Sequence, residues 1–313
     1  MKHFWLIGIL LVLTGCRHKE LWMGGSSFAS VEVTFDWSGA LTKAGEEETQ
    51  SMSLYLYPEN GNAPLYYELS GHSGGRIRLP FGRYTAVAWN HENDAILLRG
   101  QATPATLEAY TRPQPLLSSM GMSTRAPRPE SMDEERSVLE PGPFWTGSGE
   151  NLEVSMTAPL QWTIPVEDAY LRLFVQVKNV ENIAYVSEVS FALSSVSASF
   201  FPFTRTLGKE DVTIPFSGSV VDGESLEGSC TLFGHCPHDA HPHLLTVYAI
   251  LVDGRKYYTH LDVTDQVHGS SPESGTIDVV LEGVSFPDPF DGDPTASTEV
   301  DEWLTEKIDL IMQ

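Results

Sequence analysis

The run SCTLFGHCPHDAHPHLL, residues 229–245, concentrates side chains that can bind a metal ion or form a disulfide. Zinc and copper sites need three or four imidazole or thiolate ligands that converge from defined spacings. The spacing H-x-x-H-x-H matches neither paired C-x-x-C units nor an H-E-x-x-H helix. The cysteines and histidines of the run are Cys230, His235, Cys236, His238, His241 and His243.

The same run lies between two strand-like segments, SCTLFG and LLTVYAILVDG, so it is expected to connect a hairpin at the surface. An exposed polar loop is the simpler interpretation, and no cofactor is predicted. The four histidines remain metal candidates. Cys230 and Cys236 remain candidates for a disulfide, which would persist in an oxidising compartment.

The first residues, MKHFWLIGILLVLTGC, indicate that compartment. Lys2 precedes an apolar run of about ten residues, which is typical of a signal peptide and shorter than the roughly 20 residues of a membrane-spanning helix. The ending LTGC matches the bacterial lipoprotein box, in which the cysteine is lipidated and becomes the first mature residue. We therefore predict a signal peptide at 1–15, lipidation at Cys16 and a lipidated tether at 16–27.

Lipidation predicts anchoring at the outer membrane, because two or more acyl chains, such as palmitate, attach a protein lastingly. The predicted location is the cell surface. The chain carries 19 basic and 42 acidic residues, a net charge of −23. Such a surface repels polyanions, so nucleic acid is excluded as a partner and the membrane is reached only through the N-terminal lipid.

The elements that must position these residues are strands, because apolar residues alternate with polar ones along most of the chain. In VEVTFDW, for example, Val31, Val33 and Phe35 share one face. Turn-rich segments separate such runs, which predicts an all-β fold. The expected strands are 31–37, 52–57, 65–69, 76–79, 84–89, 170–177, 185–193, 211–216, 244–252, 256–263 and 276–281.

A length of 313 residues allows two domains with separate cores. We expect an N-terminal β-sandwich at 28–158, which includes a long proline- and serine-rich connection at 110–150. A C-terminal β-sandwich follows at 159–287. The acidic tail at 288–313 should end in a strand within 307–312 or in a short helix.

Other candidate chemistry is weaker. Asp288, Asp291 and Asp293 suggest calcium, but the order of ligands in an EF-hand is missing, so a solvated acidic turn is favoured. The chain has no G-x-S-x-G, Walker loop or G-x-G-x-x-G motif. An enzyme is therefore not predicted. A metal-dependent hydrolase stays as the third hypothesis and requires the histidines to converge with a carboxylate in a pocket.

A surface glycan-binding lipoprotein is the second hypothesis, because sugars stack on exposed aromatic faces. It requires tryptophans outside the strand patterns, Trp22, Trp145 and Trp303, to line a common exposed platform. Tryptophans within strand patterns, such as Trp37 and Trp89, are expected in the core.

The order of short landmarks along the chain resembles the fimbrillin-associated anchor lipoproteins of Bacteroidales, the FimB-like group of type V fimbriae. The resemblance covers most of the mature chain, and many members of that group have no assigned function. The landmarks are LTGC followed by RHKELW, VEVTFDW, GRYTAVAWN (82–90), MSTRAP (122–127), FWTG (144–147), LFGHC, LVDG and LDVTDQV (261–267).

The resemblance implies two transthyretin-like Greek-key β-sandwich domains in tandem, tethered to the outer membrane through Cys16. It implies a structural role as a fimbrial anchor, accessory or adhesion subunit, with no catalytic residues. The implied partners are fimbrillin-type protein subunits, joined by strand addition, in which an extended segment of one subunit completes the sheet of another.

Two departures from the family pattern shape this hypothesis. Fimbrillin pilins resemble one another in an early basic cleavage site, whereas only Arg17 and Lys19 lie near the mature start here. Arg125 and Arg128 lie in the middle connection, where cleavage would divide the domains. The chain therefore resembles an uncleaved anchor, and the histidine-rich loop is a local variation.

Overall fold

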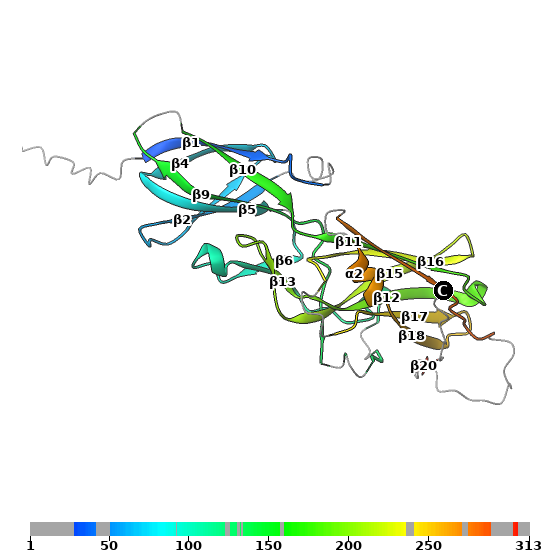
Figure 1. Cartoon of the computed structure of the whole chain (residues 1–313). Coiled ribbons are helices and arrows are strands. Elements are labelled where there is room, and N and C mark those ends of the chain that lie inside the picture. The colour runs from blue at the N-terminus through cyan, green and yellow to red at the C-terminus, as the bar shows by residue number, and fades with distance from the viewer. Residues whose placement is uncertain are drawn as a thin grey trace, which may run out of the picture.

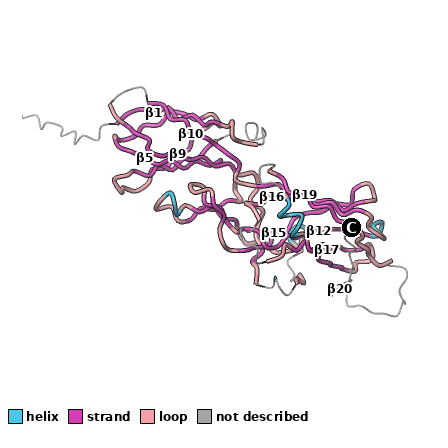
Figure 2. The backbone as a smooth tube through the Cα atoms, in the orientation of Figure 1, coloured by secondary structure: helices cyan, strands magenta, loops and turns pink. Residues whose placement is uncertain are grey.

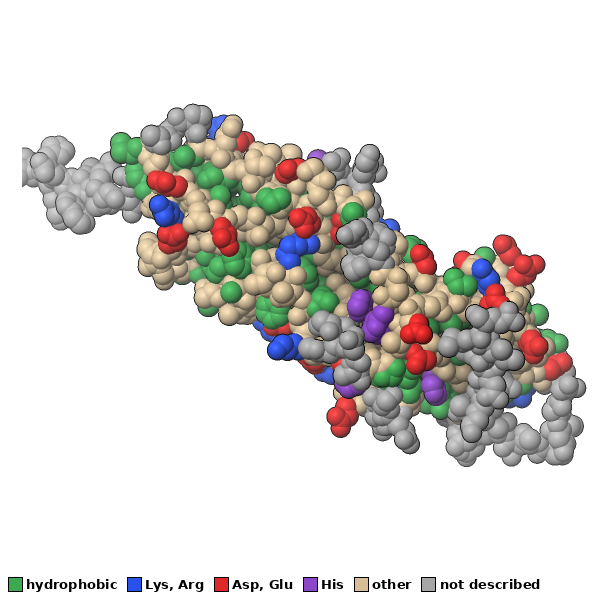
Figure 3. All heavy atoms as spheres, in the orientation of Figure 1, with side chains coloured by type: hydrophobic (Ala, Val, Ile, Leu, Met, Phe, Trp, Pro, Cys, Tyr) green, Lys and Arg blue, Asp and Glu red, His purple; other side chains and the backbone are tan. Residues whose placement is uncertain are grey.

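The structure is a computed structural model in which two lobes form an elongated molecule (Figure 1). Strands dominate both lobes (Figure 2), so the predicted all-β class is confirmed. On the face drawn in Figure 3, acidic side chains lie scattered over both lobes. The structure describes residues 28–41, 51–91, 93–122, 126–129, 132, 134–156, 160–235, 241–270, 275–288 and 303–305.

The first lobe is a seven-stranded sheet that closes around a core, in the order β3-β2-β5-β9-β10-β1-β4. The alternation read from the sequence holds: Val31, Val33 and Phe35 are all buried. β1 pairs antiparallel with β4 and parallel with β10. The strands are β1 (Phe28–Asp36), β2 (Met52–Pro58), β3 (Leu65–Leu69), β4 (Gly74–Pro80), β5 (Gly82–Asn90), β9 (Trp145–Val154) and β10 (Leu160–Asp168).

The second lobe is a nine-stranded sheet, in the order β19-β11-β16-β15-β12-β17-β18-β20, with β8 beside β15. Its core includes Leu173, Phe191 and Val247, all fully buried. The strands are β8 (Arg136–Ser137), β11 (Leu171–Lys178), β12 (Val186–Ser197), β15 (Asp211–Val221), β16 (Ser225–Leu232), β17 (Leu244–Leu251), β18 (Lys256–Asp262), β19 (Thr276–Glu282) and β20 (Trp303–Thr305).

A small four-stranded sheet lies between the lobes, in the order β14-β13-β7-β6. Arg99 donates two hydrogen bonds of 2.6 Å to Glu108, and this ion pair lowers the pKa of the Glu108 carboxyl. Glu108 also accepts a hydrogen bond from the Ser199 hydroxyl, which ties the two halves together. The strands are β6 (Ile96–Arg99), β7 (Glu108–Thr111), β13 (Ser199–Phe201) and β14 (Thr206–Leu207).

The segment expected as a connection, 110–150, begins in β7 and ends in β9, and its middle part packs against the outer face of the nine-stranded sheet. Leu116 and Leu117 form a third apolar cluster with Tyr248 of β17. The Glu135 carboxylate accepts hydrogen bonds from Ser195 and Thr213. This covering explains why most of β12 is buried on both faces.

Helices are few and short in the described chain: η1 (Pro104–Thr106), η2 (Ser118–Met120), η4 (Ile183–Tyr185) and α2 (Thr264–Gly269). None of the helices among these residues is long and apolar enough to cross a bilayer.

The sequence placed a domain boundary near residue 158. In the structure β10 still belongs to the seven-stranded sheet, and the chain passes to the nine-stranded sheet between Asp168 and Leu171. The first core also takes Phe200 and Phe233 from the second half. The expected terminal strand at 307–312 lies outside the described residues, whereas Trp303–Thr305 forms β20 just before it.

Candidate functional site

The two ends of the nine-stranded sheet are the first candidate site, because an end strand has backbone N–H and C=O groups that can pair with another chain. One end is β19. The other is β18, followed by the short β20. The two ends are covered in different ways.

The β19 end is covered by a side chain of α2. The Gln266 amide oxygen accepts a hydrogen bond of 2.8 Å from the Val280 backbone N–H, and the Gln266 amide nitrogen donates one of 3.1 Å to the Val280 carbonyl. The amide thus takes the place that a neighbouring strand would occupy. Val267, on the same helix, is fully buried and holds α2 in this position.

Local sequence explains why α2 forms there. The Asp262 carboxylate, at the end of β18, accepts hydrogen bonds from the backbone N–H and the hydroxyl of Thr264. Asp265 lies in the first turn and His268 in the last turn, which matches the charge preference of a helix at each end.

The β18 end is covered by backbone. β20 pairs with β18 in parallel, with the register Lys256↔Trp303, Tyr257↔Leu304 and Tyr258↔Thr305. β18 continues to Asp262. In the part of the chain that the structure describes, no strand pairs with β18 after Tyr258 on the side away from β17.

Trp303 fixes β20 through aromatic contacts. Its ring meets Tyr248 edge to face, with 5.3 Å between ring centroids, and Tyr248 stacks on Tyr258 at 6.5 Å. The Tyr248 hydroxyl donates a hydrogen bond of 2.8 Å to the Pro127 carbonyl, and burial raises the pKa of Tyr248. We call Trp303, Tyr248 and Tyr258 the Trp303 cluster.

The two described tryptophans among the three proposed for a glycan platform do not line an exposed surface together. Trp145 is buried in the first core, and Trp303 is half-buried on Tyr248. Trp22 lies outside the described residues. The tryptophans that the structure describes are all buried or half-buried.

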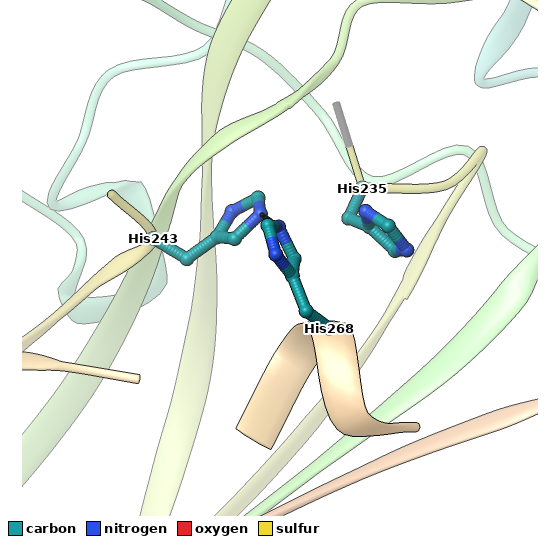
Figure 4. A group of neighbouring side chains, drawn as sticks. All are labelled: His235, His243 and His268. Atoms are coloured by element: carbon teal, nitrogen blue, oxygen red, sulfur yellow. Dashed lines mark hydrogen bonds between the residues drawn. The ribbon is translucent and has the colours of Figure 1, made fainter. Parts of the chain in front are cut away.

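The second candidate site is a cluster of three histidines (Figure 4). His235 follows β16, His243 precedes β17, and His268 lies in the last turn of α2. One ligand nitrogen from each ring lies within 4.8 Å of those of the other two. The Nε2 atoms of His243 and His268 are 3.0 Å apart.

The structure brings together two of the four predicted histidines and adds one that the sequence analysis missed. His241 instead contacts Asp211, with 2.9 Å between Nδ1 and Oδ2. His238 lies outside the described residues. His268 is 25 residues beyond His243, and the only available signal was its place after the landmark LDVTDQV.

Burial sets the electrostatics of this cluster. His243 is only 1% exposed, and this burial lowers the pKa of its imidazole. The neighbouring His268 and His235 lower that pKa further, whereas the hydrogen bond to the Ser194 carbonyl and the charge of Asp211 raise it. The net shift favours the neutral imidazole, the form that binds metal ions. The metal group contains no carboxylate, so the arrangement required for a metal-dependent hydrolase is not assembled by the described residues.

The cysteine predictions stay untested. Cys230 lies on β16, buried in the second core, and burial raises the pKa of its thiol. Its proposed partner, Cys236, lies outside the described residues, so the disulfide stays a prediction. Lipidation of Cys16 also falls outside them.

Most of the remaining predicted residues are also undescribed. Arg17, Lys19, Arg125, Asp291 and Asp293 lie outside the described residues. Asp288 is half-buried, as is Arg128, which donates hydrogen bonds to the carbonyls of Met132 and Glu135.

Comparison with known proteins relates this fold to fimbrial proteins. A relative from Bacteroides ovatus, described as "Putative fimbrium anchoring subunit Fim4B", is 30% identical over 106 residues, which are 34% of this chain and 30% of that relative. The alignment thus spans less than a third of the relative's length. This relative confirms the likeness to fimbrial anchor proteins seen in the sequence.

Solved structures with a TM-score of 0.50 or more share the fold. A "putative adhesin" from Bacteroides ovatus superposes with a TM-score of 0.60 at 18% identity and covers 88% of this chain and 99% of its own. "Putative polysaccharide binding proteins (DUF1812)" from Bacteroides thetaiotaomicron give 0.50 at 12% identity, with coverage of 81% and 90%. The fimbrial anchor protein Mfa2 from Porphyromonas gingivalis gives 0.49 at 15%, with coverage of 81% and 91%.

A family model described as "Domain of unknown function (DUF5119)" matches residues 15–217, well over half of the chain. The chain therefore belongs to the DUF5119 family.

Proposed function

We propose that this protein is an outer-membrane lipoprotein that serves as a fimbrial anchor, or as a related accessory or adhesion subunit, and that it binds fimbrillin-type subunits by strand addition. Its relation to a fimbrium anchoring subunit supports a structural role at the cell surface, without catalysis. The lipoprotein box at Cys16 supports attachment through lipid.

One observation carries the proposal of strand addition: among the described residues, β20 pairs with β18 over three positions, Trp303 to Thr305. A partner strand that runs beside β18 can pair with the backbone beyond Tyr258 or replace β20 along the whole edge. Backbone hydrogen bonds would supply affinity, and the Trp303 cluster would supply a side-chain contact that selects the partner.

The arrangement of the molecule supports an anchor. β1 lies in the N-terminal lobe, close to the end of the molecule where the described chain begins, whereas β18 and β20 lie in the other lobe (Figure 1). A lipid on Cys16 would hold the first end at the membrane. The β18 edge would then face away from the membrane, toward an added subunit.

The experiment is purification of the lipidated protein from native outer membranes, followed by mass spectrometry, with a Cys16→Ala strain as control. We expect fimbrillin subunits to co-purify with the wild type and surface fimbriae to detach in the Cys16→Ala strain. Recovery of bound polysaccharide with no protein subunit would instead support the glycan-binding hypothesis and contradict the anchor.

A further inference from the structure

The three clustered histidines come from segments that meet only in the folded protein. His235 forms an isolated antiparallel bridge with Val196 of β12. The carbonyl of His243 accepts a hydrogen bond from the Val263 N–H, just before α2, and the His243 N–H donates one to the Thr264 hydroxyl. The two ends of the histidine-rich loop and α2 are thus held at one place by backbone contacts.

The tautomer of His243 is set by an irregularity in β12. Ser195 has a φ of 59°, and the pairing of β12 with β15 shifts register between Leu193 and Val196, so the strand bulges there. The Ser194 carbonyl lies 3.2 Å from Nδ1 of His243. A carbonyl only accepts, so Nδ1 carries the hydrogen and Nε2 keeps its lone pair, which is how carbonyls orient metal-binding histidines.

We propose that His235, His243 and His268 bind one divalent first-row transition-metal ion, for which Zn²⁺ is the best-suited probe. Imidazole nitrogens bind such ions at about 2.0–2.1 Å, which in a tetrahedral site leaves roughly 3.4 Å between two ligand nitrogens. The Nε2 atoms of His243 and His268 are already 3.0 Å apart, and Figure 4 shows these two rings pointing toward one another. Three histidines leave a fourth position for water or another ligand.

The surroundings suit a cation. His268 is exposed and gives the ion access from solvent, whereas His243 is buried. The Asp211 carboxylate acts on His243 electrostatically, and its buried Oδ1 atom accepts no hydrogen bond from the residues that the structure describes. The negative charge of Asp211 therefore favours a positive ion in this cluster.

A bound ion would join α2 to both ends of the histidine-rich loop. Because α2 also carries Gln266, whose side chain covers β19, the ion would steady that cover. The metal site does not depend on the proposed fimbrial function, and the failure of either leaves the other intact.

The test is to titrate the protein with Zn²⁺ in a calorimeter. The protein is full-length and untagged, is held in detergent micelles, and is reduced and treated with chelator beforehand. The variant is His268→Ala, chosen because His268 is exposed and its removal leaves the core unchanged. The matched control is His260→Ala, an exposed histidine on β18. A second readout is the visible absorption of Co²⁺, which is intense when the ion is tetrahedral.

We expect the wild type to bind one Zn²⁺ ion per chain. The His260→Ala variant should bind Zn²⁺ with the same affinity. His268→Ala should lower the Zn²⁺ affinity by more than about 100-fold. Loss of a residue that only hydrogen-bonds to a metal ligand lowers affinity by roughly 10- to 100-fold, and loss of a ligand should cost more. His241→Ala should behave like wild type, because His241 contacts Asp211 instead. Equal affinity in wild type and His268→Ala, or Co²⁺ absorption that is weak in both, would overturn the site and show adventitious binding only.

Discussion

The two ends of the nine-stranded sheet differ in what covers them. At β19 a single side-chain amide, Gln266, bonds to the backbone of Val280. At β18 the cover is β20, a strand from the C-terminal part of the chain. A side-chain cover blocks an edge locally, whereas a backbone cover occupies the edge with the kind of group that a partner strand would bring.

The two covers also differ in the length of chain that connects each of them to the sheet. Gln266 belongs to a helix that starts two residues after β18, so its position is fixed by short-range contacts. β20 is joined to β19 through a segment of about twenty residues, and closing a longer loop costs more entropy. A partner strand therefore competes with β20 more easily than with Gln266.

The largest effect should follow removal of the backbone cover. Deleting residues 300–313 removes β20 and the Trp303 contacts, and we expect the free energy of unfolding to fall by about 2–3 kcal/mol in urea denaturation. A labelled peptide of residues 300–313 should then bind the shortened protein in trans, which fluorescence anisotropy measures. A peptide carrying Trp303→Ala is the control. Unchanged stability together with no peptide binding would contradict an exchangeable cover.

The next effect isolates the aromatic contact. Trp303→Ala should lower the free energy of unfolding by about 2 kcal/mol, because it removes a half-buried ring from Tyr248. Phe174→Ala, which truncates an exposed ring on β11, should change it by less than about 0.5 kcal/mol. Equal losses in the two variants would show that the Trp303 cluster has no special role.

Opening the other edge should have a smaller effect on stability but a visible effect on association. Gln266→Ala removes two hydrogen bonds to Val280 and should cost about 1–1.5 kcal/mol. The uncovered β19 edge should also promote dimers, measured by light scattering after size exclusion. Gln266→Glu keeps only the acceptor for the Val280 N–H and should lie between. A Gln266→Ala protein as monomeric as wild type would remove the difference between the edges.

The smallest effect should come from Tyr248→Phe. This change keeps the ring under Trp303 and removes the hydrogen bond to the Pro127 carbonyl, so we expect a loss of about 0.5–1 kcal/mol. Binding of the 300–313 peptide to the shortened protein should stay the same. A large drop in peptide binding would mean that the hydrogen bond from Tyr248 to Pro127, and not the ring of Tyr248, holds β20 in place.

Much of the fold could be predicted from the sequence. In strands with one solvent-exposed face, such as β1, apolar residues alternate with polar ones in step with burial. β10 was missed although Trp162, Ile164 and Val166 alternate, since Pro165 argues against a strand; in the structure Pro165 lies in the parallel pairing with β1. The extension of β12 to Ser197 was missed as well, because its buried residues include serines, whose polar side chains interrupt the apolar pattern expected of a buried strand.

The candidate sites were harder to predict, because both depend on contacts between distant segments. His268 joins His243 across 25 residues, and Gln266 reaches Val280 from a helix too short to leave a periodic pattern. Trp303 was noted only as an aromatic residue outside the strand patterns. Its contact with Tyr248 comes from the tertiary fold alone.

The most direct test of the β18 edge is photo-cross-linking in cells that assemble fimbriae. A photoreactive phenylalanine analogue replaces His260 on β18 or, as the matched control, Asp278 on β19; both side chains are exposed. We predict that fimbrillin-type subunits cross-link to position 260 and not to position 278. Cross-linking from position 278 alone, equally from both, or from neither would contradict strand addition at β18.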